Sequence, residues 1–481
     1  MKRNAIFYIG LLIIAGLGII ALLHFGAKLP LPIGEIHPAH VKAAPAGDAS
    51  LLGSMGDALG ANFHHPLSHL FLQLLVIITA SRLVGGLFTK FGQPAVVGEM
   101  MAGILLGPSL FGLLTPDLFQ FVFPVNSLGA LKLFSQIGVC LFMFVVGMEL
   151  NVSHVRNKAH TAVMVSHASI VVPYLLGVLL AYFLFSSLAQ PGTNFTAFAL
   201  FMGISMSITA FPVLARILQE RGLTKTYLGN TAITCAAVDD VTAWSVLAFV
   251  VAIAGSTSLG ASAINLGLVL LFIALMVWGV RVLLPKFIGA RELEQADPSK
   301  RLLAIVVCVV IGASLCTEVM GIHALFGAFL AGAIMPETAG FRHKLTIRVE
   351  NFSSVLLLPL FFAFTGLRTQ VGLLNDFQGW AICLLIILVA TVGKLGGSAV
   401  TAKFAGMNWR DSLQLGALMN TRGLMELIAL NIGYDLGILS PRIFTMLVIM
   451  ALVTTALTGP LLTLFGKVPV GAREDEGKVR A

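Results

Sequence analysis

The stretch YLGNTAITCAAVDDVTAWSVLAFVVAIA (Tyr227–Ala254) carries two adjacent aspartates, Asp239 and Asp240, near the middle of an otherwise apolar segment. Its length and hydrophobicity predict a helix that crosses a membrane. A charged carboxylate at the centre of a bilayer costs roughly 2.5–3.5 kcal/mol on insertion scales. A bound cation, a bound proton, a basic partner or a water-filled cavity must offset that cost. The pair therefore indicates a functional site within the membrane, in preference to a purely structural role.

The composition of the whole chain is typical of a polytopic membrane protein. Of its 481 residues, 57% are hydrophobic and 11% are charged, and the mean hydropathy is +0.95. A soluble domain carries about a quarter charged residues. The net charge of +8 does not indicate a nucleic-acid partner, because Lys and Arg gather in alternate short loops, the pattern of cytoplasmic loops. The five cysteines lie in apolar spans without metal-ligand spacing, so we expect no disulfide or zinc framework.

Windows of about 20 apolar residues predict an all-α protein with about thirteen core transmembrane helices and an additional N-terminal span. The tail falls on the side of the basic loops, which predicts a cytoplasmic C-terminus. The thirteen expected spans are 67–87, 94–113, 128–148, 160–185, 195–218, 227–254, 264–284, 301–319, 321–336, 349–368, 377–401, 412–436 and 442–465.

The remaining segments suggest a simple domain organisation. Residues 1–25 are expected to be a signal anchor or signal peptide, and no small-x-small cleavage site directly follows the apolar run. Residues 26–66 are expected to be an external linker, and residues 467–481 a short cytoplasmic tail. The membrane domain at 67–466 would hold a first repeat at about 67–254, a linker helix at 264–284 and a second repeat at about 301–465.

The repeat rests on two pairs of similar segments. VGEMMAGILLGP (Val97–Pro108) matches FGAFLAGAIMP (Phe326–Pro336), and FMFVVGMEL (Phe142–Leu150) matches FFAFTGLRT (Phe361–Thr369). Each pair is offset by seven expected spans, and an odd offset gives the two copies opposite orientations. Inverted repeats of this kind build many secondary transporters. The glycines that coincide are Gly98, Gly103 and Gly147 with Gly327, Gly332 and Gly366.

The fifth expected span contains a helix breaker. In GISMSITAFPVLARIL (Gly203–Leu218), Pro212 removes a helical donor and clashes with the preceding turn. The hydroxyls of Ser207 and Thr209 stand just before it. Transporter sites form where discontinuous helices expose backbone groups at the midplane. The alternative is a plain proline kink whose freed carbonyls are capped by these hydroxyls.

The twelfth expected span has polar residues in the equivalent place. In LMNTRGLMELIALNIG (Leu418–Gly433), Arg422 and Glu426 interrupt an apolar helix. They could belong to the site, or they could form an i,i+4 ion pair that stabilises the helix. Two other buried charges are candidates for charge compensation: Lys394 in the eleventh span and Glu99 in the second.

Four segments together resemble the monovalent cation:proton antiporters of the second cation/proton antiporter family. They are GQPAVVGEMMAGILLGPSLFG (Gly92–Gly112), SITAFPVLARIL (Ser207–Leu218), AAVDDV (Ala236–Val241) and NTRGLMELIALNIG (Asn420–Gly433). The resemblance runs from about Ser68 to Gly466. It implies an inverted-repeat antiporter fold with two broken helices crossing beside the acidic pair. It also implies a homodimer in contact with lipid in a bacterial inner membrane, without a cofactor.

The resemblance also implies roles for individual residues. Asp240 would bind the cation and the proton in turn, and Asp239 would pair with a basic residue. Sodium-type relatives place a lysine in the tenth span, where this chain has only Arg368 at the outer end. Lys394 and Arg422 therefore remain as candidate partners of the acids.

Physical chemistry supports the same function without the family. Mutual repulsion and removal from water both favour binding of a proton or a cation to two adjacent carboxylates, and such a pair titrates as one coupled unit. Hydroxyls of Ser207 and Thr209 and carbonyls near Pro212 could complete the oxygen shell of a cation. We expect an antiporter that exchanges a monovalent cation, Na⁺ or K⁺, for protons by alternating access.

Three other functions fit less well. An intramembrane aspartyl protease needs two carboxylates that face each other and share a proton, whereas adjacent residues on a helix point about 100° apart. A potassium channel would show a filter-like loop such as TVGYG, which the chain lacks. A sodium-coupled symporter of an organic anion remains possible on a similar inverted-repeat fold. Proton movement driven by a cation alone would distinguish the antiporter from the last two.

Overall fold

A computed structural model describes residue 62 and residues 65–149, 159–224, 226–254, 259–289, 299–336 and 341–466 of the chain. Within these ranges the fold is all-helical, as predicted, apart from 3-10 turns and an isolated bridge between Ala189 and Leu439. The expected N-terminal anchor, nearly all of the expected linker and the expected tail lie outside the described residues. They remain predictions.

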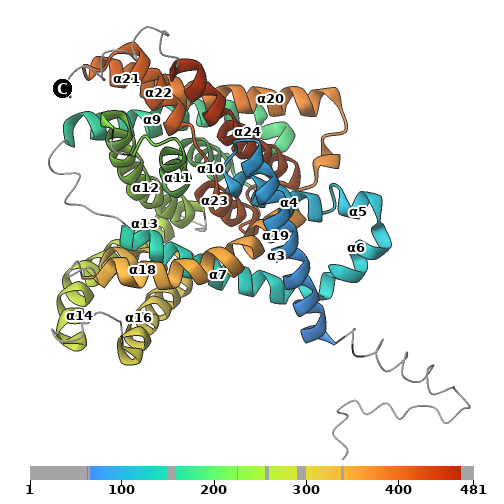
Figure 1. The fold of residues 1–481 in the computed structure, drawn as a ribbon, viewed down its shortest axis with the longest axis horizontal. Helices are drawn as coiled ribbons and strands as arrows, with labels where there is room; N and C mark the ends of the chain where they lie inside the picture. The colour runs from blue at the N-terminus through green and yellow to red at the C-terminus, as the bar shows by residue number, and fades with distance from the viewer. Residues whose placement is uncertain are drawn as a thin grey trace, which may run out of the picture. The chain divides into compact units, whose positions relative to one another are not determined.

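The helices follow the expected spans closely (Figure 1). π-helical turns at 275–280, 353–357 and 392–396 join α13 to α14, α18 to α19 and α20 to α21. The bounds are α3 (Pro66–Lys90), α4 (Ala95–Leu106), α5 (Phe111–Leu114), α6 (Pro116–Val122), α7 (Leu128–Glu149), α9 (Ala159–Leu188), α10 (Phe195–Ser207), α11 (Phe211–Glu220), α12 (Tyr227–Ala254), α13 (Leu259–Ala274), α14 (Arg281–Ile288), α16 (Lys300–Val319), α17 (Ala324–Ala333), α18 (Phe341–Phe352), α19 (Leu358–Arg368), α20 (Phe377–Thr391), α21 (Gly397–Phe404), α22 (Trp409–Met419), α23 (Leu424–Asp435) and α24 (Pro441–Gly466).

Among the described residues, eleven helical stretches are long and apolar enough to cross a membrane. The two other expected core spans take a different form. The span at 321–336 contains the short helix α17, and the span at 412–436 is divided into α22 and α23. The chain is therefore a multi-pass membrane protein, and the count of thirteen core spans remains a prediction.

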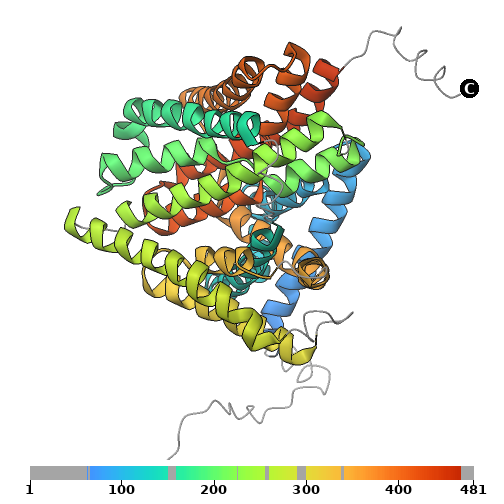
Figure 2. The ribbon, with the colours of Figure 1, turned by 90° about the vertical axis from the view of Figure 1, so that its left-hand side faces the viewer.

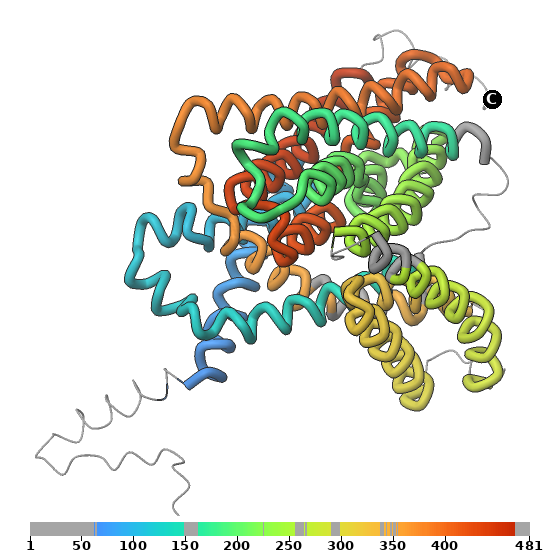
Figure 3. Tube along the Cα trace, turned by 180° about the vertical axis from the view of Figure 1, so that it is seen from behind, coloured from blue at the N-terminus to red at the C-terminus, as the bar shows by residue number. Residues whose placement is uncertain are grey.

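The helices pack as two bundles (Figures 1 and 2). The crossing bundle comprises α9 to α12 and α20 to α24, in which α10 packs on α9 and α22 packs on α24. The companion bundle comprises α3, α4, α7, α16, α17 and α19. Seen from behind, α13 and α14 lead away from the crossing bundle towards α16 (Figure 3). We name the two membrane sides after α24, which runs from the Pro441 side to the Gly466 side.

Glycines allow the closest helix contacts of the companion bundle. A Cβ atom at Gly103 on α4 would lie 2.2 Å from backbone of α19, and one at Gly366 on α19 would lie 2.0 Å from backbone of α4. A Cβ atom at Gly147 on α7 would lie 2.1 Å from backbone of α17, and one at Gly332 on α17 would lie 2.1 Å from backbone of α7. The second helix of each expected repeat thus packs on the third helix of the other. An internal two-fold axis would produce this reciprocity, and the inverted repeat itself remains a prediction.

We expect Gly103→Val to prevent stable folding. The new side chain would overlap the backbone of α19, and overpacking of a tight contact costs about 1–3 kcal/mol or more. Gly312→Val on α16 is the matched control, because a Cβ there meets nothing within 4 Å. Yield and Tm in detergent would measure the effect. Equal Tm values for the two variants would contradict the close packing of α4 on α19.

Candidate functional site

Two interrupted helices cross at the centre of the crossing bundle. Helix α10 ends at Ser207 and α11 begins at Phe211, with extended backbone between them. Helix α22 ends at Met419 and α23 begins at Leu424. The two interruptions touch, because the Ala210 N–H donates to the Thr421 carbonyl at 2.9 Å. The helix breaks predicted for the fifth and twelfth spans are therefore present, and they lie against each other.

Two threonines of α24 contact the second interruption, Thr455 at the backbone of Arg422 and Thr458 at the side chain of Thr421. Thr455 Oγ1 accepts a hydrogen bond from the Arg422 N–H at 2.9 Å and lies 2.8 Å from the Arg422 carbonyl. Thr458 Oγ1 lies 3.3 Å from Thr421 Oγ1. Non-helical backbone at membrane depth is tolerated only where protein or a water-filled cavity surrounds it. Here α24 provides that protein surface.

The carboxylate of Asp239 lies beside the crossing and is completely buried. It accepts hydrogen bonds from three hydroxyls and one ammonium group. Ser166 and Ser169 on α9 donate at 2.7 Å each, Thr209 donates at 2.6 Å, and Lys394 Nζ lies 3.0 Å away. Thr209 comes from the extended segment before Pro212, as the sequence led us to expect. The fold thus surrounds Asp239 with donors from three segments that are distant from it in sequence.

Lys394 is the basic partner of Asp239. Its side chain is fully buried and starts from the π-helical turn Val392–Gly396. Besides Asp239, the ammonium donates to the carbonyl of Ser169 at 2.9 Å and to the carbonyl of Ser207. π-Helical turns inside longer helices are frequent at functional sites. Of the two basic candidates taken from the sequence, the structure brings Lys394 to the acid.

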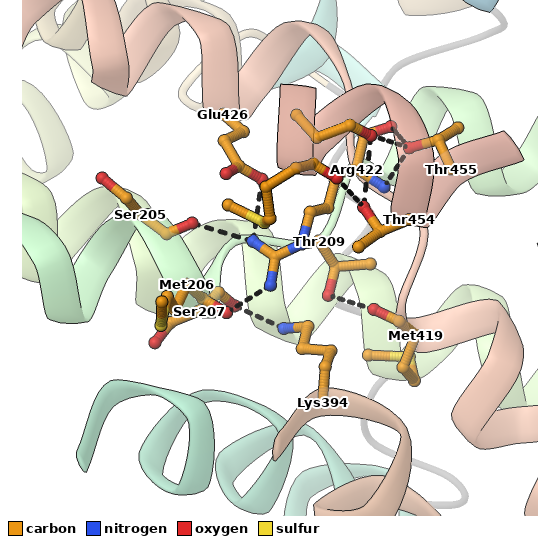
Figure 4. A network of polar contacts seen from close by, with 12 residues as sticks. Ser205, Met206, Ser207, Thr209, Lys394, Met419, Arg422, Glu426, Thr454 and Thr455 are labelled. Atoms are coloured by element: carbon orange, nitrogen blue, oxygen red, sulfur yellow. Dashed lines mark hydrogen bonds and ion pairs between the residues drawn. The ribbon is translucent and has the colours of Figure 1, made fainter. Parts of the chain in front are cut away.

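Arg422 has a different partner (Figure 4). Its guanidinium contacts Glu426 at 2.8 Å and donates to the carbonyls of Ser205 at 2.8 Å and Met206 at 2.6 Å. Both charged side chains are fully buried. The i,i+4 pair considered from the sequence is therefore present. Arg422 and Lys394 together neutralise the last carbonyls of α10, where the helix dipole favours positive charge.

The other predicted site residues lie nearby but differ in orientation. Asp240 is 1% exposed and follows Asp239 directly on α12. The Ser207 hydroxyl donates to the carbonyls of Gly203 and Ile170, at 2.8 and 3.0 Å, so it points at backbone rather than at the acids. Ser207 joins the network through its own carbonyl instead.

Glu99 lies in a cavity between the two bundles, on the Gly466 side. The cavity has a volume of about 550 Å³, and Arg82 lies 3.6 Å from Glu99 within it. It reaches the first turns of α11 and α23 and extends towards the end of α11. The lining residues include Arg82, Glu99, Pro212, Arg216, Gln219 and Leu424. Water and ions could therefore approach the crossing from this side.

The buried charges at the crossing do not balance. Among the described residues, the charged side chains that are at most 1% exposed are three acids and two bases: Asp239, Asp240, Glu426, Lys394 and Arg422. With all five ionised, the cluster has one negative charge in excess. Buried charges are costly unless paired, so this arrangement favours one added proton or one monovalent cation.

Three polar residues near the site carry little signal in the sequence. Ser166 and Ser169 lie one turn apart on α9 and look like ordinary small residues of a membrane helix, yet both bind Asp239. The Asn420 side chain is fully buried and has no hydrogen-bond partner within the described ranges. Only its place in the broken twelfth span distinguished Asn420 beforehand.

We expect Arg422→Met to destabilise the protein strongly. The substitution would leave Glu426 as an unpaired buried charge and two α10 carbonyls without donors, and breaking a buried pair costs about 3–5 kcal/mol. Glu426→Gln should cost less, because the amide oxygen can still accept from Arg422. Arg301→Met, at an exposed position of α16, is the matched control. Thermal unfolding in detergent would measure this, and an unchanged Tm for Arg422→Met would contradict the role assigned to Arg422.

Crossed discontinuous helices around a buried acidic pair define the class of secondary transporters. The profile of the transmembrane sodium/hydrogen exchanger family matches residues 75–468. The chain belongs to this family, whose members are transporters rather than enzymes.

Individual relatives with antiporter names support the same assignment to the family. The chain is 44% identical to the Na⁺/H⁺ antiporter NhaS4 of Synechocystis, over 82% of this chain and 97% of the relative. It is 39% identical to cation/H⁺ antiporter 17 of Arabidopsis thaliana and 31% identical to K⁺/H⁺ antiporter 1 of Saccharomyces cerevisiae. The matches cover 83% and 84% of this chain, which spans about half the length of these two relatives.

A solved structure shares the fold. The sodium–proton antiporter MjNhaP1 of Methanocaldococcus jannaschii superposes with a TM-score of 0.57 over 83% of this chain and 97% of its own. The sequence identity is 14%, so this likeness concerns the fold alone.

Proposed function

We propose that this chain exchanges a monovalent cation for protons across a bacterial inner membrane by alternating access. The observation that carries the proposal is the fully buried Asp239 carboxylate, held between Lys394 and three hydroxyls where two broken helices cross, with Asp240 beside it. Membership of the sodium/hydrogen exchanger family and the names of the relatives support the same function.

Asp240 and Asp239 have separate roles in this proposal. Asp240 binds a cation or a proton in turn, because the cluster has one negative charge in excess. Asp239 holds Lys394 while the cation is absent. A cation that binds between the two carboxylates weakens the attraction of Asp239 for Lys394. Oxygens of Ser166, Ser169 and Thr209 are then in place to act as ligands, and oxygen ligands suit hard cations.

The cavity on the Gly466 side would be the cytoplasmic approach to the site. In the topology expected from the sequence, the basic loops and the tail lie on that side. The positive-inside rule places such loops in the cytoplasm. Glu99 is the acidic group of the cavity lining and would attract cations towards the crossing. The protein would work as a homodimer, and its tail would be cytoplasmic.

Proteoliposomes that contain purified protein and a pH-sensitive dye would test the exchange. A proton gradient is imposed, and Na⁺, K⁺ and Li⁺ are added in turn to separate samples. The proposal expects one or more of these cations to collapse the gradient, which would also identify the ion. Gradients that persist with every cation would contradict antiport and favour the channel or the symporter.

A further inference from the structure

A second, smaller pocket lies between the two bundles on the Pro441 side. Its volume is about 30 Å³, room for about one water molecule. Residues of α7, α19 and α23 line this pocket, together with residues at the start of α17. The same three helices also line the larger cavity on the Gly466 side. The two spaces therefore lie along one path between the bundles.

An apolar barrier about one helical turn thick separates the two spaces. On α23, Leu424 lines the larger cavity and Ile428 lines the pocket, so their Cα atoms are about 6 Å apart along the helix. On α7 the corresponding residues are Phe142 and Val139, three positions apart, whereas on α19 the adjacent Phe362 and Phe361 line the cavity and the pocket respectively. The barrier therefore interrupts the path between the larger cavity on the Gly466 side and the pocket on the Pro441 side.

A polar cluster lies at the Pro441 end of the path, and we name it the Asp435 cluster; its members are Asp435, Asn431, Arg368 and Lys132. Asp435, the last residue of α23, accepts from Arg368 of α19 at 2.6 Å and lies 3.3 Å from Lys132 of α7. The second terminal nitrogen of the Arg368 guanidinium, Nη1, donates to the Asn431 side-chain oxygen on α23 at 2.9 Å. The Asn431 amide in turn donates to Thr365 at 2.9 Å.

Aromatic rings fix the central side chain of this cluster. The Arg368 guanidinium lies 4.2 Å from the ring centre of Phe364 and 5.0 Å from that of Tyr434. Its side chain is 15% exposed, against 26% for Asp435 and 37% for Lys132. Partial burial and a fixed guanidinium make these ion pairs stronger than freely exposed ones.

The cluster joins the two bundles. Asp435 and Asn431 belong to α23, which packs on α10 and α24 at the crossing. Arg368 and Lys132 belong to α19 and α7, which pack on α4 and α17. Any motion that opens the path on the Pro441 side must separate α23 from α7 and α19. Such a motion must break these contacts.

We propose that the Asp435 cluster holds the two bundles together on the Pro441 side and so keeps the path closed there. The cluster thereby sets the fraction of molecules whose path is open to the Gly466 side. This inference rests on the alternating access of the proposed function. The members of the Asp435 cluster are positioning residues, because they touch neither the aspartate pair nor the proposed cation.

Cysteine reporters on α23 provide the test. Ile428→Cys reports the pocket and Leu424→Cys reports the larger cavity, and a charged thiol reagent is applied in detergent to the full chain. In the Asp435→Asn background, labelling of the first should rise and labelling of the second should fall, so that the ratio of the first to the second rises by roughly five-fold, the effect expected from losing a partly exposed ion pair. Lys132→Gln should change the labelling in the same direction, and it replaces Asp435→Asn in the test if that variant does not fold. The chain without reporters gives the background of the native cysteines.

Asp376→Asn is the matched control. Asp376 pairs with Arg442 on the same side, but both belong to the crossing bundle, so labelling should not change. Unchanged labelling of both reporters in the Asp435→Asn and Lys132→Gln backgrounds would overturn the inference. Exchange by the wild type is measured separately. A labelling shift without any exchange would support the contact and refute the proposed function, whereas exchange without a shift would refute the contact alone.

Discussion

Asp240→Asn is expected to abolish cation-driven proton movement while the protein still folds. The substitution removes one of the three fully buried acids and leaves two acids opposite two bases. The cluster then has no excess negative charge to be met by a cation or a proton. Folding should survive, because replacing an excess buried charge by a neutral group of the same shape removes a desolvation cost.

The dye assay in proteoliposomes measures this loss, and thermal unfolding in detergent checks the fold. Asp117→Asn is the matched control, since Asp117 is an exposed carboxylate in the first turn of α6. We expect the control to exchange at the wild-type rate. Exchange by a folded Asp240→Asn variant at more than a small fraction of that rate would exclude Asp240 as the shared site.

Lys394→Met is expected to produce the second-largest effect, on both stability and transport. The ammonium is the positive partner of Asp239 and also binds the carbonyls of Ser169 and Ser207. Removing one partner of a buried pair costs about 3–5 kcal/mol, because the remaining charge is uncompensated. In the variant, Asp239 itself becomes free to hold a proton or a cation, so exchange should slow and the net charge moved per cycle should change.

A double-mutant cycle separates the ion pair from the other contacts of Lys394. Asp239→Asn removes the charge that Lys394 balances, so Lys394→Met should cost less in that background, by about 1–3 kcal/mol. Thermal unfolding of the four proteins measures the difference, and solid-supported-membrane currents measure the charge moved. If Lys394→Met costs the same in both backgrounds, Lys394 acts only on the α10 carbonyls and the pairing with Asp239 contributes nothing.

The sequence predicted the fold well because each membrane-spanning helix consists of a long run of apolar residues. Pro212 predicted the end of α10, and the polar residues from Asn420 to Glu426 predicted the break between α22 and α23. Both signals are local, since a missing donor or a polar interruption acts on its own helix. The short α17 and the π-helical turn at Lys394 were not predicted, because packing against other helices determines both.

The site was harder to predict in detail because its contacts are long-range. Lys394 lies 155 positions from Asp239 in the chain, and Ser169 lies 70 positions away. Nothing local distinguished Lys394 from Arg422 as the partner of the acid. The direction of the Ser207 hydroxyl depends on the backbone carbonyls of Gly203 and Ile170, which only the folded chain places within reach.

The dependence of the cation KM on pH tests most directly whether cation and proton share one site. Wild-type protein in proteoliposomes is assayed for exchange over a range of cation concentrations at several pH values. Competition predicts that the KM rises as the pH falls, approaching ten-fold per pH unit where the site is mostly protonated, while the maximal rate at saturating cation is unchanged. A KM that is independent of pH, with a maximal rate that falls instead, would show that protons act elsewhere and would contradict the shared aspartate site.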